Sequence, residues 1–421
     1  MYDLKKGYEV AKEYYAQYGI DVDAVIKACD ETPISMHCWQ GDDVGGTELK
    51  EDKALTGGIQ TTGNYPGKAR NGEELRADID MAMKFIPGTL KMNVHANYIE
   101  AGRPVDRNEI EPEHYQKWVD WAVEKGVGLD FNPTYFAHPK SDNGTLSCAD
   151  EETRKFWVEH GIRCRRVGQY FAEKTGKPCV INHWTPDGDK EVPVDTLGPR
   201  QRLKKSYDEI FAATEDVTGV IDGIESKVFG IGMESYTVGS HEFCMGYVMN
   251  AKKDHIIMTL DAGHYHPTET VSNKLSGIYT FADSVLLHVT RAVRWDSDHV
   301  VGLEDETKAI FEELVRMNKL QDTYVATDFF DASINRISAW VIGLRNTRKA
   351  ILAAMLQPND KMKELEAAGD VTARLAYKEE FKAAPFSLVW DYYCAQKGAG
   401  VGLEWLAEVK KYEEEVLSKR A

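Results

Sequence analysis

Short apolar runs alternate along this chain with amphipathic stretches that repeat at the helical period. Eight apolar runs have the length of strands, at residues 34–39, 91–98, 127–132, 178–184, 220–227, 256–264, 284–291 and 323–330. Helical stretches lie between them, for example at 114–125, 153–173, 200–214, 240–253 and 305–320. Alternating strand and helix signals indicate βαβ units and a parallel sheet. Eight such units predict an α/β fold of the (β/α)₈ TIM-barrel type.

After Asp331 the pattern stays helical to the last residue. It predicts helices at 332–356, 360–384, 387–396 and 403–418, separated in part by Pro358 and Pro385. We therefore expect a barrel with an N-terminal helix over 1–331, and a C-terminal helical extension over 332–421 that packs on the barrel or on neighbouring subunits. The segment 41–63 is rich in Gly, Asp and Thr, which predicts a loop over the barrel mouth.

Polar side chains stand near the carboxyl end of every predicted strand. In chain order these are His37 with Trp39, His95 with Asn97, Asp130 with Asn132, Asn182 with Trp184, Glu225 with Lys227, Asp261 with His264, His288, and Asp328. Barrel enzymes place their catalytic groups at this rim. One polar strand end carries little information, but eight in succession predict a functional mouth.

Two of the candidate metal-binding segments have alternative structural interpretations. Strand periodicity alone puts Asp261 and His264 on opposite faces, although a turn at Gly263 would bring both side chains inward. The alternative is an Asx-capped turn that ends the strand. Asp296 and Asp298 share one side of an extended chain and so are spaced to hold one cation, or they belong to a polar loop before a helix.

Glu225 and Lys227 lie on one face of an apolar strand. They form a surface ion pair, or they point into the mouth, where an unpaired buried charge requires a metal or substrate partner. The same argument applies to Asp328, whereas Asp331 is interpreted as a helix N-cap. Carboxylate and imidazole donors suit Mn²⁺, Co²⁺, Mg²⁺ or Zn²⁺. Their number is sufficient for two ions that share a carboxylate and act together on two adjacent oxygens.

Aromatic residues at strand ends add a possible sugar-binding surface. Trp39, Trp184 and Trp295 either pack in the core or form flat walls for sugar C–H faces. His37 and His95 either contact hydroxyl groups and act in ring opening, or are structural, and the structural interpretation is favoured most for His37.

Composition narrows the class of protein. The formal net charge of −17 argues against a nucleic-acid partner. Seven scattered cysteines without a CxxC pair favour reduced thiols in the cytoplasm. The first residues lack an apolar signal core, and no run approaches the length of a membrane span. Nucleotide-binding motifs are also missing.

Several motifs resemble the L-rhamnose isomerase family over nearly the whole chain. They are SMHCWQGDD at 35–43, GNYPGKARN at 63–71, ESK at 225–227, LDAGH at 260–264, RWDSDH at 294–299 and DFFDAS at 328–333. The stretches 45–53 and 250–255 diverge, and neither carries a proposed ligand.

The resemblance implies a xylose-isomerase-like barrel, a homotetramer and two divalent cations, of which Mn²⁺ is commonly the catalytic one. The implied reaction of carbohydrate catabolism is the interconversion of L-rhamnose and L-rhamnulose. One ion would be held by Glu225, Asp261, His288 and Asp328; the catalytic ion would take His264, Asp296 and Asp298, with Asp261 bridging. Lys227, His95 and Trp184 match positions that contact the sugar.

On this ligand set, Asp328 would assist removal of the O2 proton and Lys227 would help to polarise the C1 carbonyl, while hydride moves from C2 to C1. A cis-enediol route through a carboxylate base gives the same product. Three other functions remain open at this point: a two-metal hydrolase or phosphodiesterase, a sugar epimerase, and a non-catalytic metal or sugar binder.

Overall fold

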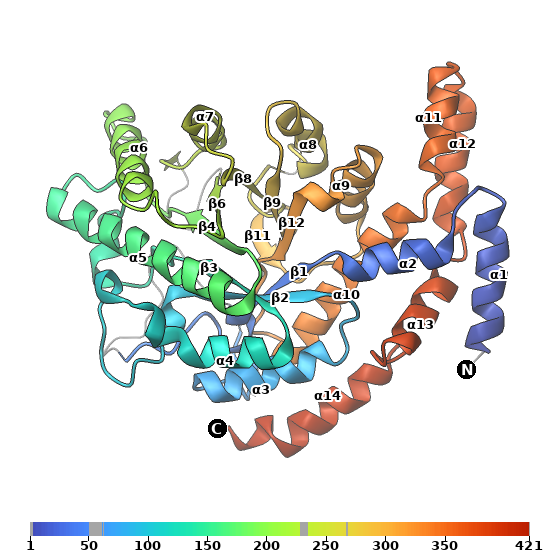
Figure 1. The fold of residues 1–421 in the computed structure, drawn as a ribbon, viewed down its shortest axis with the longest axis horizontal. Coiled ribbons are helices and arrows are strands. Elements are labelled where there is room, and N and C mark those ends of the chain that lie inside the picture. The colour runs from blue at the N-terminus through green and yellow to red at the C-terminus, as the bar shows by residue number, and fades with distance from the viewer. Residues whose placement is uncertain (1–2, 50–60, 62, 228–234, 267, 421) are drawn as a thin grey trace.

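The computed structural model describes residues 3–49, 61, 63–227, 235–266 and 268–420, apart from the side chains of Trp295 and Asp296. Among these residues, eight parallel strands form a closed barrel in the order β1-β12-β9-β8-β6-β4-β3-β2 (Figure 1). The strands are β1 (Ile34–His37), β2 (Leu90–His95), β3 (Gly128–Asn132), β4 (Cys179–Trp184), β6 (Val220–Glu225), β8 (Ile256–Asp261), β9 (Val285–Val289) and β12 (Thr323–Thr327). The predicted barrel is confirmed, and each observed strand overlaps one predicted run.

Helices form the layer outside the strands (Figure 1). They are α3 (Gly72–Met83), α4 (Gln116–Lys125), α5 (Glu151–Thr175), α6 (Leu197–Ala212), α7 (His241–Ala251), α8 (Val271–Tyr279), α9 (Asp305–Arg316) and α10 (Arg336–Met355). Local signals explain their ends: Asp150 caps α5 by accepting a hydrogen bond from the Thr153 N–H, and Gly176 ends it with φ +66°. Helix α10 packs against α9, α3 and β1, so it lies on the barrel between the last strand and the first.

Two small sheets lie outside the barrel. One pairs β5 (Gly188–Asp189) with β7 (Tyr236–Thr237), and the other pairs β10 (Arg291–Val293) with β11 (Trp295–His299). The second matters for the site, because pairing with β10 keeps β11 extended a few residues after the end of β9. The extended backbone expected around Asp298 is therefore present.

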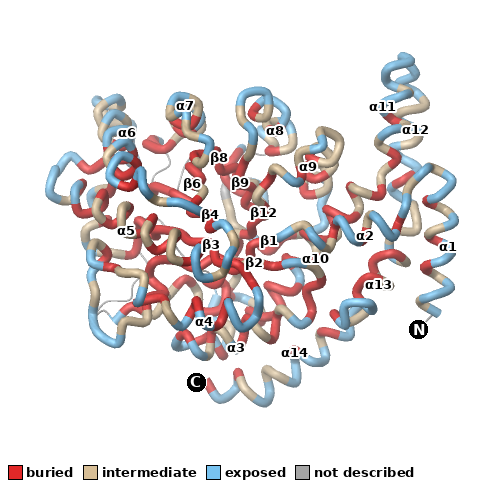
Figure 2. The backbone as a smooth tube through the Cα atoms, in the orientation of Figure 1, coloured by how far each residue is buried: buried red, intermediate tan, exposed pale blue. Residues whose placement is uncertain are grey.

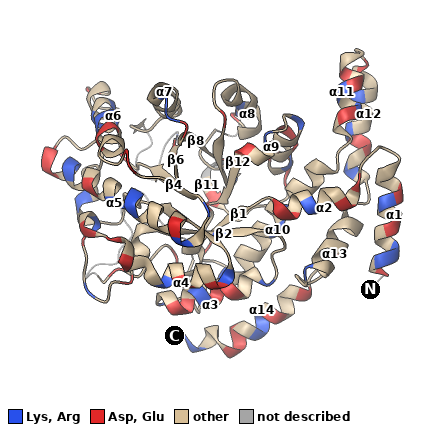
Figure 3. Ribbon diagram, viewed as in Figure 1, with Lys and Arg blue, Asp and Glu red and all other residues tan. Residues whose placement is uncertain are grey.

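The remaining α-helices lie outside this layer, most of them at one side of the barrel (Figure 1). They are α1 (Leu4–Ala16), α2 (Val22–Glu31), α11 (Asn359–Ala367), α12 (Val371–Glu380), α13 (Phe386–Gln396) and α14 (Glu404–Glu415). Helices α11 and α12 project away from the barrel, and α12 has no buried residue (Figures 1 and 2). Charged residues recur along α1, α11, α12 and α14, whereas α13 carries few of them (Figure 3). Within the described part of the chain, no helix has the length and apolar character required to span a bilayer.

Two local predictions were wrong. The single helix expected at 360–384 is divided into α11 and α12, because Gly369 adopts φ +75° and Asp370 starts a new helix by capping the Ala373 N–H. Asp331 does not cap α10; its Oδ1 accepts a hydrogen bond from Ser333 N at 2.7 Å, while Asn335 is the N-cap. In both cases a short polar turn replaces one helical turn.

Candidate active site

A pocket opens at the carboxyl end of the barrel strands. Its lining residues are Trp39, Val44, His95, Asn132, Phe136, Trp184, Glu225, Lys227, His264, Asp298, Asp328 and Phe330. Alternate residues of a strand share a face, so each barrel strand can send its last residue toward this mouth. Strands far apart in the sequence thus contribute acids, imidazoles and aromatic rings to one cavity.

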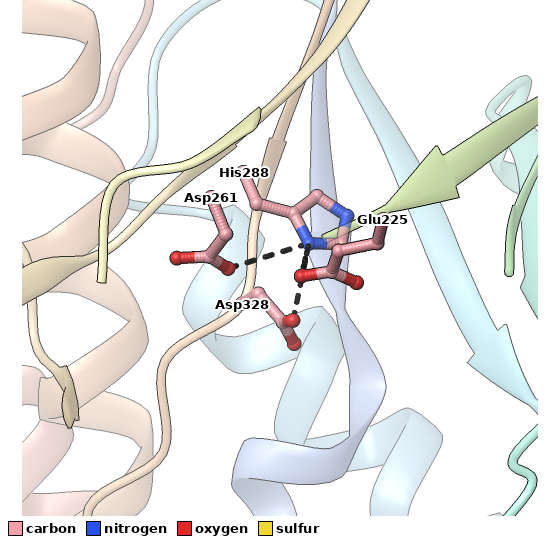
Figure 4. Close-up of side chains that lie close together, drawn as sticks. All are labelled: Glu225, Asp261, His288 and Asp328. Carbon is pink, nitrogen blue, oxygen red and sulfur yellow. Dashed lines mark ion pairs between the residues drawn. The ribbon is translucent and has the colours of Figure 1, made fainter. Parts of the chain in front are cut away.

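Four donor side chains gather below the pocket. Glu225, Asp261 and His288 come from the ends of β6, β8 and β9, and Asp328 directly follows β12. One donor atom from each lies within 4.8 Å of those of the other three. Nδ1 of His288 is 3.1 Å from Asp328 Oδ2, 3.5 Å from Asp261 Oδ2 and 3.6 Å from Glu225 Oε1. Figure 4 shows the three carboxylates turned toward this ring.

A second group of donors shares Asp261 with the first. Donor atoms of Asp261, His264 and Asp298 also lie within 4.8 Å of one another. Nε2 of His264 is 3.7 Å from Asp298 Oδ1 and 4.0 Å from Asp261 Oδ2. The side chain of Asp296, expected in the same group, lies outside the described residues.

In both Asp261 and Glu225, one carboxylate oxygen accepts a hydrogen bond from an uncharged group and the other faces the donor cluster. Oδ1 of Asp261 accepts hydrogen bonds from the Gly263 N–H (2.6 Å) and from the Thr290 hydroxyl (2.8 Å). The Asx turn and the inward-pointing carboxylate, considered as alternatives above, therefore coexist. In the same way Oε2 of Glu225 accepts from the Asn182 amide, whose oxygen accepts from Thr259 at 2.9 Å.

Gly263 is required here for space. A Cβ at this position would come within 2.7 Å of both Ser297 O and Thr290 Oγ1, and 3.0 Å from Asp298 Oδ1. The missing side chain lets β11 approach the end of β8 closely. That approach is what brings Asp298 beside Asp261 and His264.

The donor atoms that remain fit a divalent cation. Oε1 of Glu225, Oδ2 of Asp261, Oδ1 of Asp298 and both ring nitrogens of His288 are buried without a hydrogen-bond partner. Buried polar atoms normally have partners, so a cluster of orphaned anionic oxygens calls for a positive charge. Mixed carboxylate and imidazole donors match hard and borderline divalent metals.

The pKa values of the site residues also indicate that the buried carboxylates require positive charge beside them. Burial alone lowers the pKa of His264, but the carboxylates of Asp261 and Glu225 outweigh burial and raise it to about 10. The pKa of His288 lies well above its usual value, because the negative charges of Asp328 and Glu225 outweigh burial, which by itself lowers it. Burial raises the pKa of Asp298 to about 7, against the attraction of Lys227. Without metal, protonated imidazoles thus balance the carboxylates.

Lys227, His95 and Trp184, the three residues expected to contact the sugar, lie together on the pocket wall. The Lys227 ammonium is 3.3 Å from His264 Nε2 and 5.3 Å from the centre of the Trp184 ring. Burial lowers the pKa of His95 well below its usual value, so its ring is neutral, and neither ring nitrogen has a partner. The Trp39 ring stacks on His95 with centroids 3.8 Å apart. The unpartnered ring nitrogens of His95 and Trp184, beside flat aromatic surfaces, suit a polyhydroxylated ligand.

Other residues of the predicted rim have different surroundings. His37 is structural, since its Nδ1 bonds to Thr327 Oγ1 at 2.8 Å and burial lowers its pKa to about 3. Asp130 does not belong to the mouth; it pairs with Lys91 near the amino end of the barrel. Asp130 and Asn132 are two residues apart, so they share one face of β3, but Asp130 lies two residues nearer to the amino end of the strand. The side chain of Trp295 lies outside the described residues.

Sequence reasoning missed the apolar wall of the pocket. Val44, Phe136 and Phe330 line it, although none of the three was a candidate site residue. Val44 has φ +63°, a backbone conformation that is rare for a β-branched residue. Because the residue at this position is not a glycine, the sequence does not indicate this conformation. Val44 belongs to the loop expected over the mouth at 41–63, of which residues 50–60 and 62 lie outside the described part.

Fold and site together define a (β/α)₈-barrel protein with the donor groups of a divalent-metal centre at its mouth. The chain belongs to the L-rhamnose isomerase family, whose sequence profile matches residues 2–420. Relatives named L-rhamnose isomerase from Salmonella paratyphi B and Salmonella typhi are each 53% identical over 419 residues, 99% of both chains. It is therefore an intramolecular oxidoreductase of the aldose–ketose isomerase class.

Solved structures resemble the chain at lower similarity. L-ribulose 3-epimerase aligns with a TM-score of 0.49 and 11% identity, over 79% of this chain and 97% of that one. A 3-keto-D-glucoside 4-epimerase from E. coli aligns with a TM-score of 0.46 and 14% identity, over 69% and 99%. The family assignment rests on the sequence relatives, and it favours the isomerase over a hydrolase, an epimerase or a non-catalytic binder.

Proposed function

We propose that this isomerase interconverts L-rhamnose and L-rhamnulose at the pocket described above, using two divalent cations. The observation that carries the proposal is the pair of donor groups that share Asp261 directly below a pocket with neutral N–H donors and aromatic walls. The names of its relatives support the choice of sugar. The direct test is ketose formation from L-rhamnose by metal-loaded protein, compared with protein treated with a chelator.

In this proposal Glu225, Asp261, His288 and Asp328 would hold one ion, and His264, Asp296 and Asp298 would hold the catalytic ion, with Asp261 belonging to both donor groups. Bound cations would supply Lewis acidity toward two adjacent oxygens of the open-chain sugar. Manganese is our choice of metal, because this mixed oxygen and nitrogen donor set suits it, and Co²⁺, Mg²⁺ or Zn²⁺ would fit the same donors.

Side chains of the pocket have the remaining catalytic and sugar-binding roles in this proposal. The Lys227 ammonium donates to the C1 carbonyl oxygen and so draws electron density from C1. The Asp328 carboxylate assists in accepting the proton of the O2 hydroxyl. Neutral His95 hydrogen-bonds a sugar hydroxyl, and Trp184 covers an apolar face of the sugar and keeps water out.

The route of the transferred hydrogen separates the two candidate mechanisms. Direct hydride transfer from C2 to C1 keeps the hydrogen out of contact with solvent, and we expect this route because no partner-free carboxylate outside the donor groups lines the pocket wall among the described residues. In deuterated water the ketose product should then carry almost no deuterium at C1. Deuterium found at C1 by NMR would establish the cis-enediol route instead.

Thr290 is expected to tune metal affinity without touching the sugar. Its hydroxyl fixes Oδ1 of Asp261, which leaves Oδ2 for the cations. Thr290→Val, nearly equal in volume, should weaken metal binding by about 10- to 100-fold, the usual effect of removing such a supporting hydrogen bond. Isothermal titration of the metal-free protein measures this loss. Thr290→Ser keeps the hydroxyl and should restore most of the affinity; equal weakening in both variants would exclude the proposed role.

We further propose a cytoplasmic homotetramer in which residues 332–421 supply subunit contacts. All seven cysteines are described, and none forms a disulfide, which suits a reducing compartment. Helix α12 exposes Val371 and Leu375 on the projecting hairpin, beyond the part of the extension that packs on the barrel. Sedimentation equilibrium tests the assembly, and a monomeric mass would refute it.

A further inference from the structure

A second cavity, of about 270 Å³, opens at the amino end of the barrel, opposite the active site. It lies against the first residues of six barrel strands and the residues just before them. Its lining is Pro33, Ser35, Thr89, Lys91, Asp130, Lys177, Pro178, Val180, Leu286, Gln321, Thr323, Tyr324 and Val325. On β4, Val180 lines this cavity and Trp184 lines the active site, four residues or about 13 Å along the strand.

An unfilled space of this size is unusual in this place. The inside of a barrel is ordinarily a packed core, and protein interiors contain few voids larger than a water molecule. Here Val180 and Leu286 belong to a small apolar cluster separate from the main core. Both side chains line the cavity together with Tyr324, which packs against the same cluster, so the wall of the cavity here is apolar.

One buried polar atom in the lining also lacks a partner. Ser35 is 3% exposed, and its hydroxyl makes no hydrogen bond. The charged groups nearby are already satisfied: Lys91 binds Asp130 and Pro178 O (2.8 Å), and Lys177 donates to Gly126 O. The cavity therefore offers apolar walls and the unpartnered hydroxyl of Ser35, while both lysines are held in hydrogen bonds to the chain.

The cavity is accessible from solvent. Pro33, Pro178 and Gln321, which border it, are exposed at the amino face of the barrel. A closed apolar cavity of about 150 Å³ is enough to hold benzene, so this larger space accommodates one ring with a few further atoms.

We propose that this cavity is a second binding site, which takes a small uncharged molecule made of one apolar ring with a single hydroxyl group. The ring lies against Val180, Leu286 and Tyr324. Its hydroxyl pairs with the Ser35 hydroxyl, which can both donate and accept. The site is separate from the isomerase pocket and its existence does not depend on the proposed sugar.

Two probes of equal shape test the proposal: 4-ethylphenol, and ethylbenzene, which lacks the hydroxyl. Titrations of the full protein by ligand-detected NMR should show both binding, 4-ethylphenol more tightly. Ser35→Ala should weaken 4-ethylphenol about fivefold, the effect of one hydrogen bond, and leave ethylbenzene unchanged. Saturating L-rhamnose should displace neither probe. No binding to the natural sequence, equal loss for both probes, or displacement by the sugar would overturn the proposal.

A cavity-filling substitution gives an independent check. Val180→Phe should abolish binding of both probes while L-rhamnose turnover stays unchanged, since the substitution lies at the opposite end of the strand from the pocket. Val123→Phe, on the exposed surface of α4, is the matched control and should keep both activities. A Val180→Phe protein that is folded by circular dichroism and still binds the probes contradicts the proposal. If that variant does not fold, Ser35→Leu fills the cavity from β1 and is judged by the same outcomes.

Discussion

Replacing Asp261 by asparagine is expected to reduce L-rhamnose turnover by at least about 10³-fold and to weaken the binding of both cations, since several kcal/mol of charge stabilisation depend on them. Asp261 is the one described residue that belongs to both donor groups. The asparagine amide oxygen can still accept from Gly263 N–H and Thr290, so the turn at the end of β8 should survive. The loss then reports on the missing carboxylate charge.

Two neighbouring substitutions supply the matched controls. Asp328→Asn alters only the first donor group, and Asp298→Asn alters only the second. Metal content after dialysis, measured by elemental analysis, should therefore fall for one ion in each single-group variant and for both in Asp261→Asn. If Asp261→Asn retained two ions at the affinity of the unaltered protein, the shared-carboxylate arrangement would be wrong.

Replacing Lys227 by methionine should lower kcat by about 10²- to 10³-fold, the usual cost of removing one group that stabilises developing charge. Methionine fills similar space and keeps contact with the Trp184 ring, but it removes the ammonium 3.3 Å from His264 Nε2. Metal content should be unchanged, because Lys227 is not a donor. The measurement is steady-state kinetics with L-rhamnose, together with metal analysis of the same sample.

The division between kcat and KM distinguishes catalysis from simple sugar binding. A role in polarising the C1 carbonyl lowers kcat, whereas a role in binding alone raises KM and leaves kcat unchanged. Trp184→Phe is the comparison: it keeps an apolar wall but removes the indole N–H and one of the two fused rings, so it should change KM more than kcat. A Lys227→Met enzyme with unaltered kcat would remove Lys227 from the proposed catalytic role.

The site residues that could be predicted from the sequence are those marked by local patterns of apolar and polar residues. Strand ends are visible in sequence because an apolar run stops at a polar residue, and in a parallel barrel all such ends meet at one mouth. Glu225, Asp261, His264, His288 and Asp328 could be collected in this way, and the structure brings their donor atoms together. The same rule misplaced Asp130, because this residue lies two positions before the end of β3 and pairs with Lys91 on the amino side of the barrel.

Features that depend on contacts between distant segments were not visible. Val44 reaches the pocket through a backbone conformation that its residue type disfavours. Thr290 and Asn182 orient the carboxylates of Asp261 and Glu225 from neighbouring strands, and no local spacing marks those hydrogen bonds.

The division of 360–384 into two helices could have been predicted, since Gly369-Asp370 is a helix end followed by an N-cap.

The sequence by itself determined the order of strands and helices, the polar rim and the types of donor atoms, because hydrophobic period and residue chemistry are local properties. Only the tertiary structure decided that Asp261 serves two donor groups, that Gly263 makes room for Asp298, and that the amino end of the barrel holds an open cavity. Those facts depend on distances between residues far apart in the chain, which closure of the barrel fixes.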